Sequence, residues 1–252
     1  MIPAVKKTNP GTKRLGIIGG MGARAGVLFM QKVVDYSPVC KDQDFIEMIL
    51  HSNSCIPDRT RAILYDGDSP EEELIRSVEG FDPYRIDVIV LACMTAYHYY
   101  DVLQPRTRAC ILHPAKVLGE HLEAHYPGAR RIGVLASTGA IRAGIFGRLT
   151  AAGNREIITL DDDAQESKFM RSLYMPGGLK SGVITEEARR LFFDAVADLD
   201  RKGVDVLVGG CSEVSILLND DTQEIPYVDI MDLLAKEAVR LCYGSNSAVI
   251  AF

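Results

Sequence analysis

The chain has 252 residues, of which 47% are hydrophobic and 25% are charged. This composition is that of an ordinary globular protein and excludes the disordered and fibrous classes. The formal charge is −6, and no block of five like charges occurs, so we expect neither nucleic-acid nor membrane-surface binding. A chain of this length buries roughly 70–75% of the surface that its unfolded form exposes, which is enough for two lobes with a core each.

The predicted strands and helices alternate along the whole chain. After a polar segment without the apolar run of a signal peptide, the expected strands are 15–18, 46–50, 88–92, 109–112, 132–135, 156–160, 206–210 and 226–229. Helices are expected between them, among them 71–78, 96–103 and 114–125, with a last helix at 230–242. Continuous apolar strands such as 88–92 are typical of parallel sheets buried on both faces. The class is therefore predicted to be α/β.

The second half of this pattern repeats the first at a nearly constant offset. Leu15–Ile18 matches Ile132–Leu135, Val88–Cys93 matches Val206–Cys211, and Cys110–His113 matches Pro226–Asp229. We predict two pseudo-symmetric Rossmann-like α/β lobes with mostly parallel four-stranded sheets and an active site in the cleft between them. The expected division is a leader at 1–13, lobe 1 at 14–113 plus 230–244, lobe 2 at 114–229, and a tail at 245–252.

Six cysteines are spread over the chain without a C-x-x-C pair, which excludes zinc ribbons and thioredoxin-type motifs. Since no signal peptide and no run of about 18 apolar residues is present, we expect a cytoplasmic protein with free thiols. Cys93 and Cys211 end matching strands, so we expect them to face each other across the cleft. The remaining four have no partner at the repeat offset and are expected to be inert buried residues: Cys40, Cys55, Cys110 and Cys242.

Two facing thiols suggest acid–base chemistry at a carbon atom. Each cysteine precedes a predicted helix, with Thr95 and Ser212 as candidate caps, and a helix start favours the thiolate. One thiolate would remove a proton from Cα while the opposite thiol delivers one to the other face, which inverts the stereocentre. Backbone N–H groups in the turns 19–22 and 137–139 would stabilise the carboxylate of the carbanion.

Several motifs together resemble the aspartate/glutamate racemase family, the amino acid racemases that work without pyridoxal phosphate. The similarity runs from about Arg14 to Leu241 and rests on Gly16–Gly22, Ile56–Thr60, Cys93-x-Thr95-Ala96, Ser137–Ile141 and Gly210–Glu213. The resemblance implies an isomerase of amino acid metabolism, with Cys93 and Cys211 as the acid–base pair. It further implies that no cofactor and no metal is used, and that the enzyme is a cytoplasmic homodimer acting on a small amino acid.

The resemblance also assigns residues to the substrate. Arg59 would meet a side-chain carboxylate, for which a planar guanidinium is suited, and Lys180 resembles the second cationic group of the family. The full set of predicted substrate-binding residues is Met21, Asn53, Arg59, Met94, Thr95, Thr138, Lys180, Ser212 and Glu213.

The chain departs from the family pattern at the cleft. Met94 and Tyr97 stand where the family usually has asparagine and histidine, and Ala23-Arg24 replaces a frequent Pro-Glu. The loss of an amide leaves the cleft more apolar. The expected substrate is therefore either aspartate/glutamate-like or a modified, larger or less polar amino acid.

Other functions stay open at this point. Relatives of the fold include decarboxylases and cis–trans isomerases of small diacids, which need one thiol or a different polar set. Gly20-x-Gly22-x-x-Ala25 formally fits the fingerprint of an NAD-dependent oxidoreductase, but the strand 46–50 does not end in the expected acidic residue. A non-catalytic amino-acid-binding protein would also have two lobes and a cleft, yet it gives no reason for paired thiols.

Overall fold

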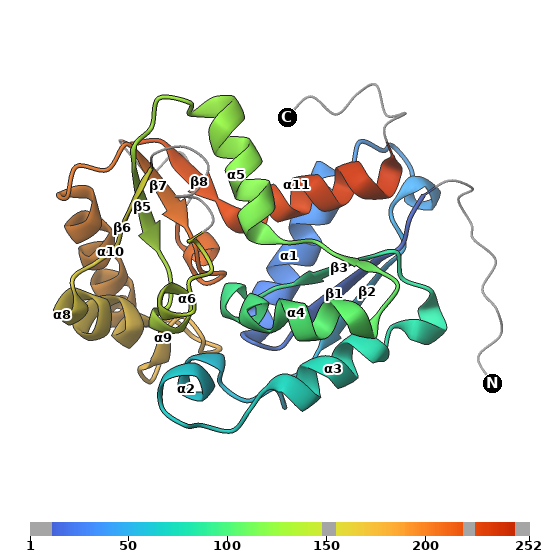
Figure 1. Cartoon of the computed structure of the whole chain (residues 1–252), viewed down its shortest axis with the longest axis horizontal. Coiled ribbons are helices and arrows are strands. Elements are labelled where there is room, and N and C mark those ends of the chain that lie inside the picture. The colour runs from blue at the N-terminus through green and yellow to red at the C-terminus, as the bar shows by residue number, and fades with distance from the viewer. Residues whose placement is uncertain (1–11, 148–154, 219–224, 245–252) are drawn as a thin grey trace.

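Two parallel β-sheets form the framework of the molecule in the computed structural model (Figure 1), which describes residues 12–147, 155–218 and 225–244. The first sheet has the order β2-β1-β3-β4, with β1 Leu15–Gly19, β2 Met48–Ser52, β3 Val88–Leu91 and β4 Cys110–Ile111. The second has the order β6-β5-β7-β8, with β5 Arg131–Leu135, β6 Glu156–Ile158, β7 Val206–Gly209 and β8 Tyr227–Asp229. All six strand pairings are parallel. The predicted α/β class, the two four-stranded sheets and the repeat are confirmed.

Helices cover the faces of both sheets. They are α1 Ala23–Tyr36, α2 Arg59–Leu64, α3 Glu71–Glu79, α4 Tyr100–Leu103, α5 Pro114–His125, α6 Thr138–Arg142, α8 Asp162–Ala164, α9 Arg171–Tyr174, α10 Glu186–Asp200 and α11 Ile230–Tyr243. Shorter 3₁₀ segments are η1 Asp42–Asp44, η2 Asp82–Tyr84, η3 Met94–Tyr99, η4 Gln104–Arg106 and η6 Val214–Ile216, and η5 Gln165–Met170 is a π-helix. The central strands β1, β3 and β7 are buried along their whole length, as continuous apolar sequences between two helix layers should be.

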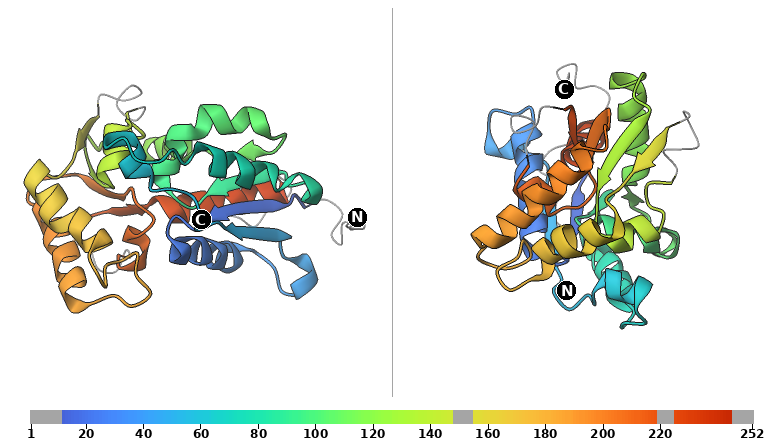
Figure 2. Two further views of the ribbon diagram at one scale, coloured as in Figure 1. Left: turned by 90° about the horizontal axis from the view of Figure 1, so that it is seen from below. Right: turned by 90° about the vertical axis from the view of Figure 1, so that its left-hand side faces the viewer.

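Two helices connect the halves of the chain. α5 follows the first sheet and packs against α11, and α11 packs in turn against α1. Figure 2 shows α8, α9 and α10 gathered at the end of the molecule away from the first sheet. The lobe boundaries stay predictions, and the leader and tail lie outside the described residues at 1–11 and 245–252.

Several local expectations need correction. The helix expected at 96–103 is a 3₁₀ segment, η3, followed by the short α4. The strand expected at 46–50 lies at Met48–Ser52, because pairing with β1 places Met48 opposite Leu15. The strand expected at 156–160 ends at Ile158, because its pairing with β5 ends there. Thr95 and Ser212 cap no helix, since Cys93 and Glu213 take the cap positions and no side-chain cap bond forms.

The expectation that the four remaining cysteines are buried is wrong for three of them. Cys40, Cys55 and Cys110 are exposed, and only Cys242 is buried. Cys40 and Cys55 lie in surface loops, and Cys110 begins the short edge strand β4. Loops and sheet edges face solvent whatever the preference of a free thiol for the core.

Within the described ranges, no helix is long and apolar enough to span a membrane.

Candidate active site

Cys93 and Cys211 lie at the carboxyl ends of corresponding strands, β3 and β7, and line one cavity. Both are buried, with 6% and 7% of their surface exposed. Residues of the first half on the cavity wall are Arg59, Thr60, Cys93, Met94 and Thr95; those of the second half are Ser137, Leu173, Tyr174, Lys180, Cys211, Ser212 and Glu213. The cavity measures about 10 Å³, close to the size that one water requires. In this structure the cavity therefore has room for about one water and not for an amino acid.

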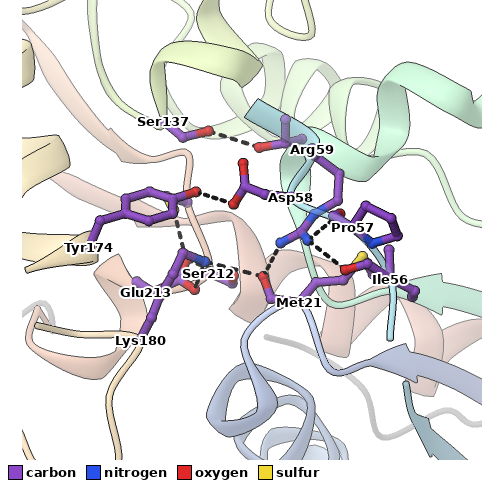
Figure 3. Close-up of polar contacts among 12 residues, drawn as sticks. Met21, Ile56, Pro57, Asp58, Arg59, Ser137, Tyr174, Lys180, Ser212 and Glu213 are labelled. Carbon is purple, nitrogen blue, oxygen red and sulfur yellow. Dashed lines mark hydrogen bonds and ion pairs between the residues drawn. The ribbon is translucent and has the colours of Figure 1, made fainter. Parts of the chain in front are cut away.

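The carboxylate of Glu213 links the polar groups of Cys211, Ser212 and Lys180 (Figure 3). Its Oε2 accepts hydrogen bonds from Cys211 Sγ at 2.9 Å and from Ser212 Oγ at 3.1 Å, and its Oε1 accepts one from Lys180 Nζ at 2.6 Å. Burial together with the adjacent carboxylate raises the pKa of the Cys211 thiol well above its usual range. The thiol form of Cys211 is thus the favoured one.

Lys180 and Glu213 form a buried ion pair. Burial alone would raise the pKa of Glu213, but the ammonium of Lys180 and the hydrogen bonds from Cys211 and Lys180 outweigh it and hold that pKa low. Burial also opposes the charge of Lys180, yet the carboxylate raises the pKa of Lys180 in spite of it. Both groups are therefore ionised, and each neutralises the other.

Arg59 lies near the other thiol. Its Nη2 donates to Met21 O at 2.6 Å and its Nη1 to Pro57 O at 2.8 Å, while no acceptor for the buried Nε is found among the described residues. Burial disfavours the guanidinium charge, but a thiolate at Cys93 and the carboxylate of Asp58 offset this and raise the pKa of Arg59. Cys93 thus has a cation beside it, whereas Cys211 has an anion.

The turn after β1 supplies a backbone acceptor to both cationic side chains. Lys180 Nζ donates to Met21 O at 3.2 Å, the same carbonyl that Arg59 uses. Gly20 precedes it with a φ of +90°, and a Cβ there would lie 2.3 Å from the carbonyl of Asn53. Only glycine fits at position 20, which explains this glycine of the motif.

A family model described as Asp/Glu/Hydantoin racemase matches residues 18–238. The chain belongs to this family. It is 24% identical over 238 residues to the broad specificity amino-acid racemase RacX of Bacillus subtilis (strain 168), a match that covers 92% of this chain and 100% of the relative.

Solved structures of racemases share the fold. The Picrophilus torridus aspartate racemase superposes with a TM-score of 0.77 at 24% identity, over 90% of this chain and 93% of that one. An aspartate racemase homologue from Pyrococcus horikoshii OT3 gives a TM-score of 0.70 at 16% identity, over 92% of this chain and 100% of that one. The two-lobed racemase fold predicted from the motifs is confirmed.

The structure gathers most, but not all, of the residues that the racemase resemblance assigns to the substrate. Arg59, Met94, Thr95, Lys180, Ser212 and Glu213 line the cavity with the two cysteines, whereas Met21, Asn53 and Thr138 do not. The side chain of Asn53 donates to Glu73 and Ser77 instead, and Thr138 donates to Glu166. The assignment to the substrate stays a prediction for the whole set.

Four further residues on the cavity wall lie outside the predicted substrate-binding set: Thr60, Ser137, Leu173 and Tyr174. Ser137 Oγ lies 2.8 Å from Thr95 Oγ1, and Tyr174 donates its hydroxyl to Asp58 Oδ2 at 2.8 Å, so both join the two halves. Thr60 and Ser137 belong to the motifs Ile56–Thr60 and Ser137–Ile141, and this membership could have identified them as site residues. Leu173 and Tyr174 belong to none of these motifs.

Two residues at which the chain departs from the family pattern, Tyr97 and Arg24, do not line the cavity. The hydroxyl of Tyr97 is buried and accepts a hydrogen bond from Leu91 N at 3.1 Å, so it is not offered to a substrate. Arg24 donates to Gly182 O at 2.8 Å and thereby ties α1 to the segment beyond Lys180. In the described residues, no three acidic, histidine or cysteine side chains gather as a metal site.

Proposed function

We propose that the chain is a cofactor-independent amino acid racemase or epimerase in which Cys93 and Cys211 are the acid–base pair. The observation that carries this proposal is the position of the two thiols, which end equivalent strands of the two sheets and line the same small cavity. A substrate Cα between them would have one sulfur on each face.

The proposed reaction needs only proton transfers. A thiolate takes the Cα proton: the Cα–H bond breaks, its electron pair stays on carbon, and an S–H bond forms. The opposite thiol gives its proton to the other face of the carbanion and becomes a thiolate, so the stereocentre is inverted. The free Nε–H of Arg59 is a donor for the substrate carboxylate, whose negative charge grows in this step. Thr95 and Ser137 bond to each other, and the hydroxyl of that pair whose hydrogen is not used is a second donor.

The charges of the cavity support a substrate with an uncharged side chain. The racemase resemblance assigns a side-chain carboxylate to Arg59 and makes Lys180 the second cationic group, but Glu213 already neutralises Lys180 at 2.6 Å. Met94 and Leu173 add apolar surface, which stabilises apolar groups and not carboxylates. The relative RacX is named a broad specificity amino-acid racemase, which agrees with a substrate other than aspartate or glutamate. We propose that uncharged amino acids react faster than aspartate or glutamate.

Both thiols are present, which favours a racemase over a decarboxylase or a cis–trans isomerase of a small diacid, since those reactions need one thiol or a different polar set. No observation in the described part of the chain favours an NAD-dependent oxidoreductase. The homodimer and the cytoplasmic location stay predictions, of which the first is checked by light scattering of the purified protein.

The test is deuterium exchange at Cα. The protein is incubated in deuterated water with single enantiomers of uncharged and acidic amino acids; NMR follows the loss of the Cα proton, and chiral chromatography follows inversion. We expect exchange and inversion of uncharged amino acids, and neither with the Cys93→Ser/Cys211→Ser double variant. If the folded protein binds an amino acid tightly and none exchanges, the proposal is wrong.

A further inference from the structure

The two thiols of the cavity differ in their charged neighbours, and the difference is largest at Cys211. Its Sγ lies 2.9 Å from Glu213 Oε2, and Glu213 is only 2% exposed. A carboxylate accepts hydrogen bonds and donates none, so this contact is favourable only while the sulfur keeps its proton. A thiolate in the same place would put two negative charges next to each other out of water.

Lys180 keeps that carboxylate charged. Its Nζ donates to Glu213 Oε1 at 2.6 Å and to Met21 O at 3.2 Å, and the ion pair holds the pKa of Glu213 low. The negative charge beside Cys211 is therefore permanent near neutral pH. Ser212 Oγ also donates to Oε2 at 3.1 Å, which fixes the orientation of the carboxylate.

Cys93 has a different set of neighbours. Arg59 and Lys180 are cations that interact with it, and Lys180 is also paired with Glu213. Tyr97 beside it is a buried neutral phenol that accepts a hydrogen bond from Leu91 N. At Cys211 the corresponding groups are Glu213 and Lys180. A neighbouring cation stabilises a thiolate, and an anion stabilises the thiol.

We propose that Glu213 is a positioning residue that keeps the proton on Cys211, so that Cys93 begins the reaction as the base and Cys211 as the acid. The proposal rests on the proposed function. For one enantiomer, Cys93 takes the Cα proton and Cys211 gives its own to the opposite face. Cys211 then regains a proton from solvent and Cys93 loses one to it. For the other enantiomer, the same two exchanges must come first.

The test compares the pH dependence of alkylation at the two thiols. The full chain is treated with iodoacetamide across a pH series, and peptide mass spectrometry follows Cys93 and Cys211 separately from the exposed cysteines. Because both thiols are equally buried, the midpoint of each profile is compared and not the absolute rate. In the wild type we expect Cys93 to react at lower pH than Cys211. In Glu213→Gln, the Cys211 profile should move to lower pH by about one unit or more while the Cys93 profile stays.

Two variants control for indirect effects. Glu166→Gln removes an exposed carboxylate of the same half that bonds Thr138 and should leave both profiles in place. Glu213→Asp retains the charge, so Cys211 should still react only at the higher pH. This variant is the second test if Glu213→Gln does not fold. The proposal is overturned if Cys211 reacts at or below the pH of Cys93 in the wild type, or if Glu213→Gln leaves its profile unchanged.

Alkylation needs no turnover, so this test fails separately from the racemase proposal. Profiles as expected, together with no Cα exchange of any amino acid, would refute the racemase and leave the action of Glu213 on the Cys211 proton standing. If amino acids undergo Cα exchange and inversion but the pH profiles of the two thiols overlap, only the role of Glu213 is refuted.

Discussion

Each sulfur of the cavity is held by the strand that precedes it, and the repeat of the chain makes the two positions equivalent. Cys93 follows β3, and Cys211 comes two residues after the last residue of β7. The pairing was predictable because it depends on two features that sequence shows directly: apolar strands and a constant offset. The charges next to each thiol were not predictable in the same way, because Glu213 was assigned to the substrate and its contact with Lys180 spans 33 residues.

Single serine replacements test the two thiols. Cys93→Ser and Cys211→Ser should each lower interconversion by roughly 10²–10⁴-fold, because a hydroxyl neither accepts nor gives the Cα proton readily. Each variant should retain Cα exchange from at most one enantiomer, measured by NMR in deuterated water. Cys110→Ser, which changes an exposed cysteine outside the cavity, is the matched control. A single variant that interconverts enantiomers at the wild-type rate contradicts the assignment.

Variants of Met94 test the proposed preference for uncharged substrates. Met94→Asn adds an amide to the cavity wall and should raise the rate ratio of aspartate to alanine by about fivefold, which corresponds to one hydrogen bond of about 1 kcal/mol. Met94→Leu keeps the wall apolar and should leave the ratio unchanged. Competition of the two amino acids in one reaction measures the ratio directly, and equal ratios in both variants would remove Met94 from specificity.

Two short helices bring the halves into contact beside the cavity. α6 approaches α2 so closely that a Cβ on Gly139 would lie 2.6 Å from Thr60 Oγ1 and 2.9 Å from Thr60 Cα. The motif Ser137–Ile141 contains this glycine, but the need for a glycine there cannot be predicted from the motif, because the residue that excludes a side chain, Thr60, lies in the other half. Such contacts between halves explain why the elements were predictable and the wall of the cavity was only partly so.

Gly139→Ala should push α6 from α2. We expect a loss of about 1–3 kcal/mol in the free energy of unfolding, as for other overpacked contacts, together with a higher KM because the cavity wall is displaced. Urea titration and steady-state kinetics measure the two effects. Gly128→Ala adds the same methyl group where nothing lies within 4 Å and should change neither. An unaltered KM in Gly139→Ala would show that this contact does not shape the site.

For the molecule as a whole, stability depends on the helices that connect the halves. His121 lies on α5, its ring centroid 4.4 Å from that of His125, and it also feels Lys236 of α11. Burial, and then these two groups, lower its pKa to about 4. The order of the sheets and the return of α11 follow from the repeat and from apolar patterning, whereas the pKa of His121 depends first on burial by the surrounding elements and then on His125 and Lys236.

The free energy of unfolding should therefore fall as pH falls from about 6.5, the ordinary pKa of histidine in an unfolded chain, towards 4. Between about pH 6.5 and pH 4, His121 binds a proton in the unfolded chain but not in the folded one. The stability that is present above about pH 6.5 is therefore lost as the pH falls. His121→Gln should flatten this part of the profile in denaturant titrations, while His98→Gln, at an exposed position of η3, should not. Identical slopes for His121→Gln and the wild type would refute this.

The near-symmetry of the two sheets has a kinetic consequence for a racemase. Enantiomers have equal free energies in water, so the equilibrium lies midway whatever the enzyme does, and kcat/KM must be the same in both directions. The unlike neighbours of Cys93 and Cys211 cannot alter that equality. They can only change kcat and KM together. The enantiomer that requires Cys211 as the thiolate and Cys93 as the thiol should show a lower kcat and a proportionally lower KM.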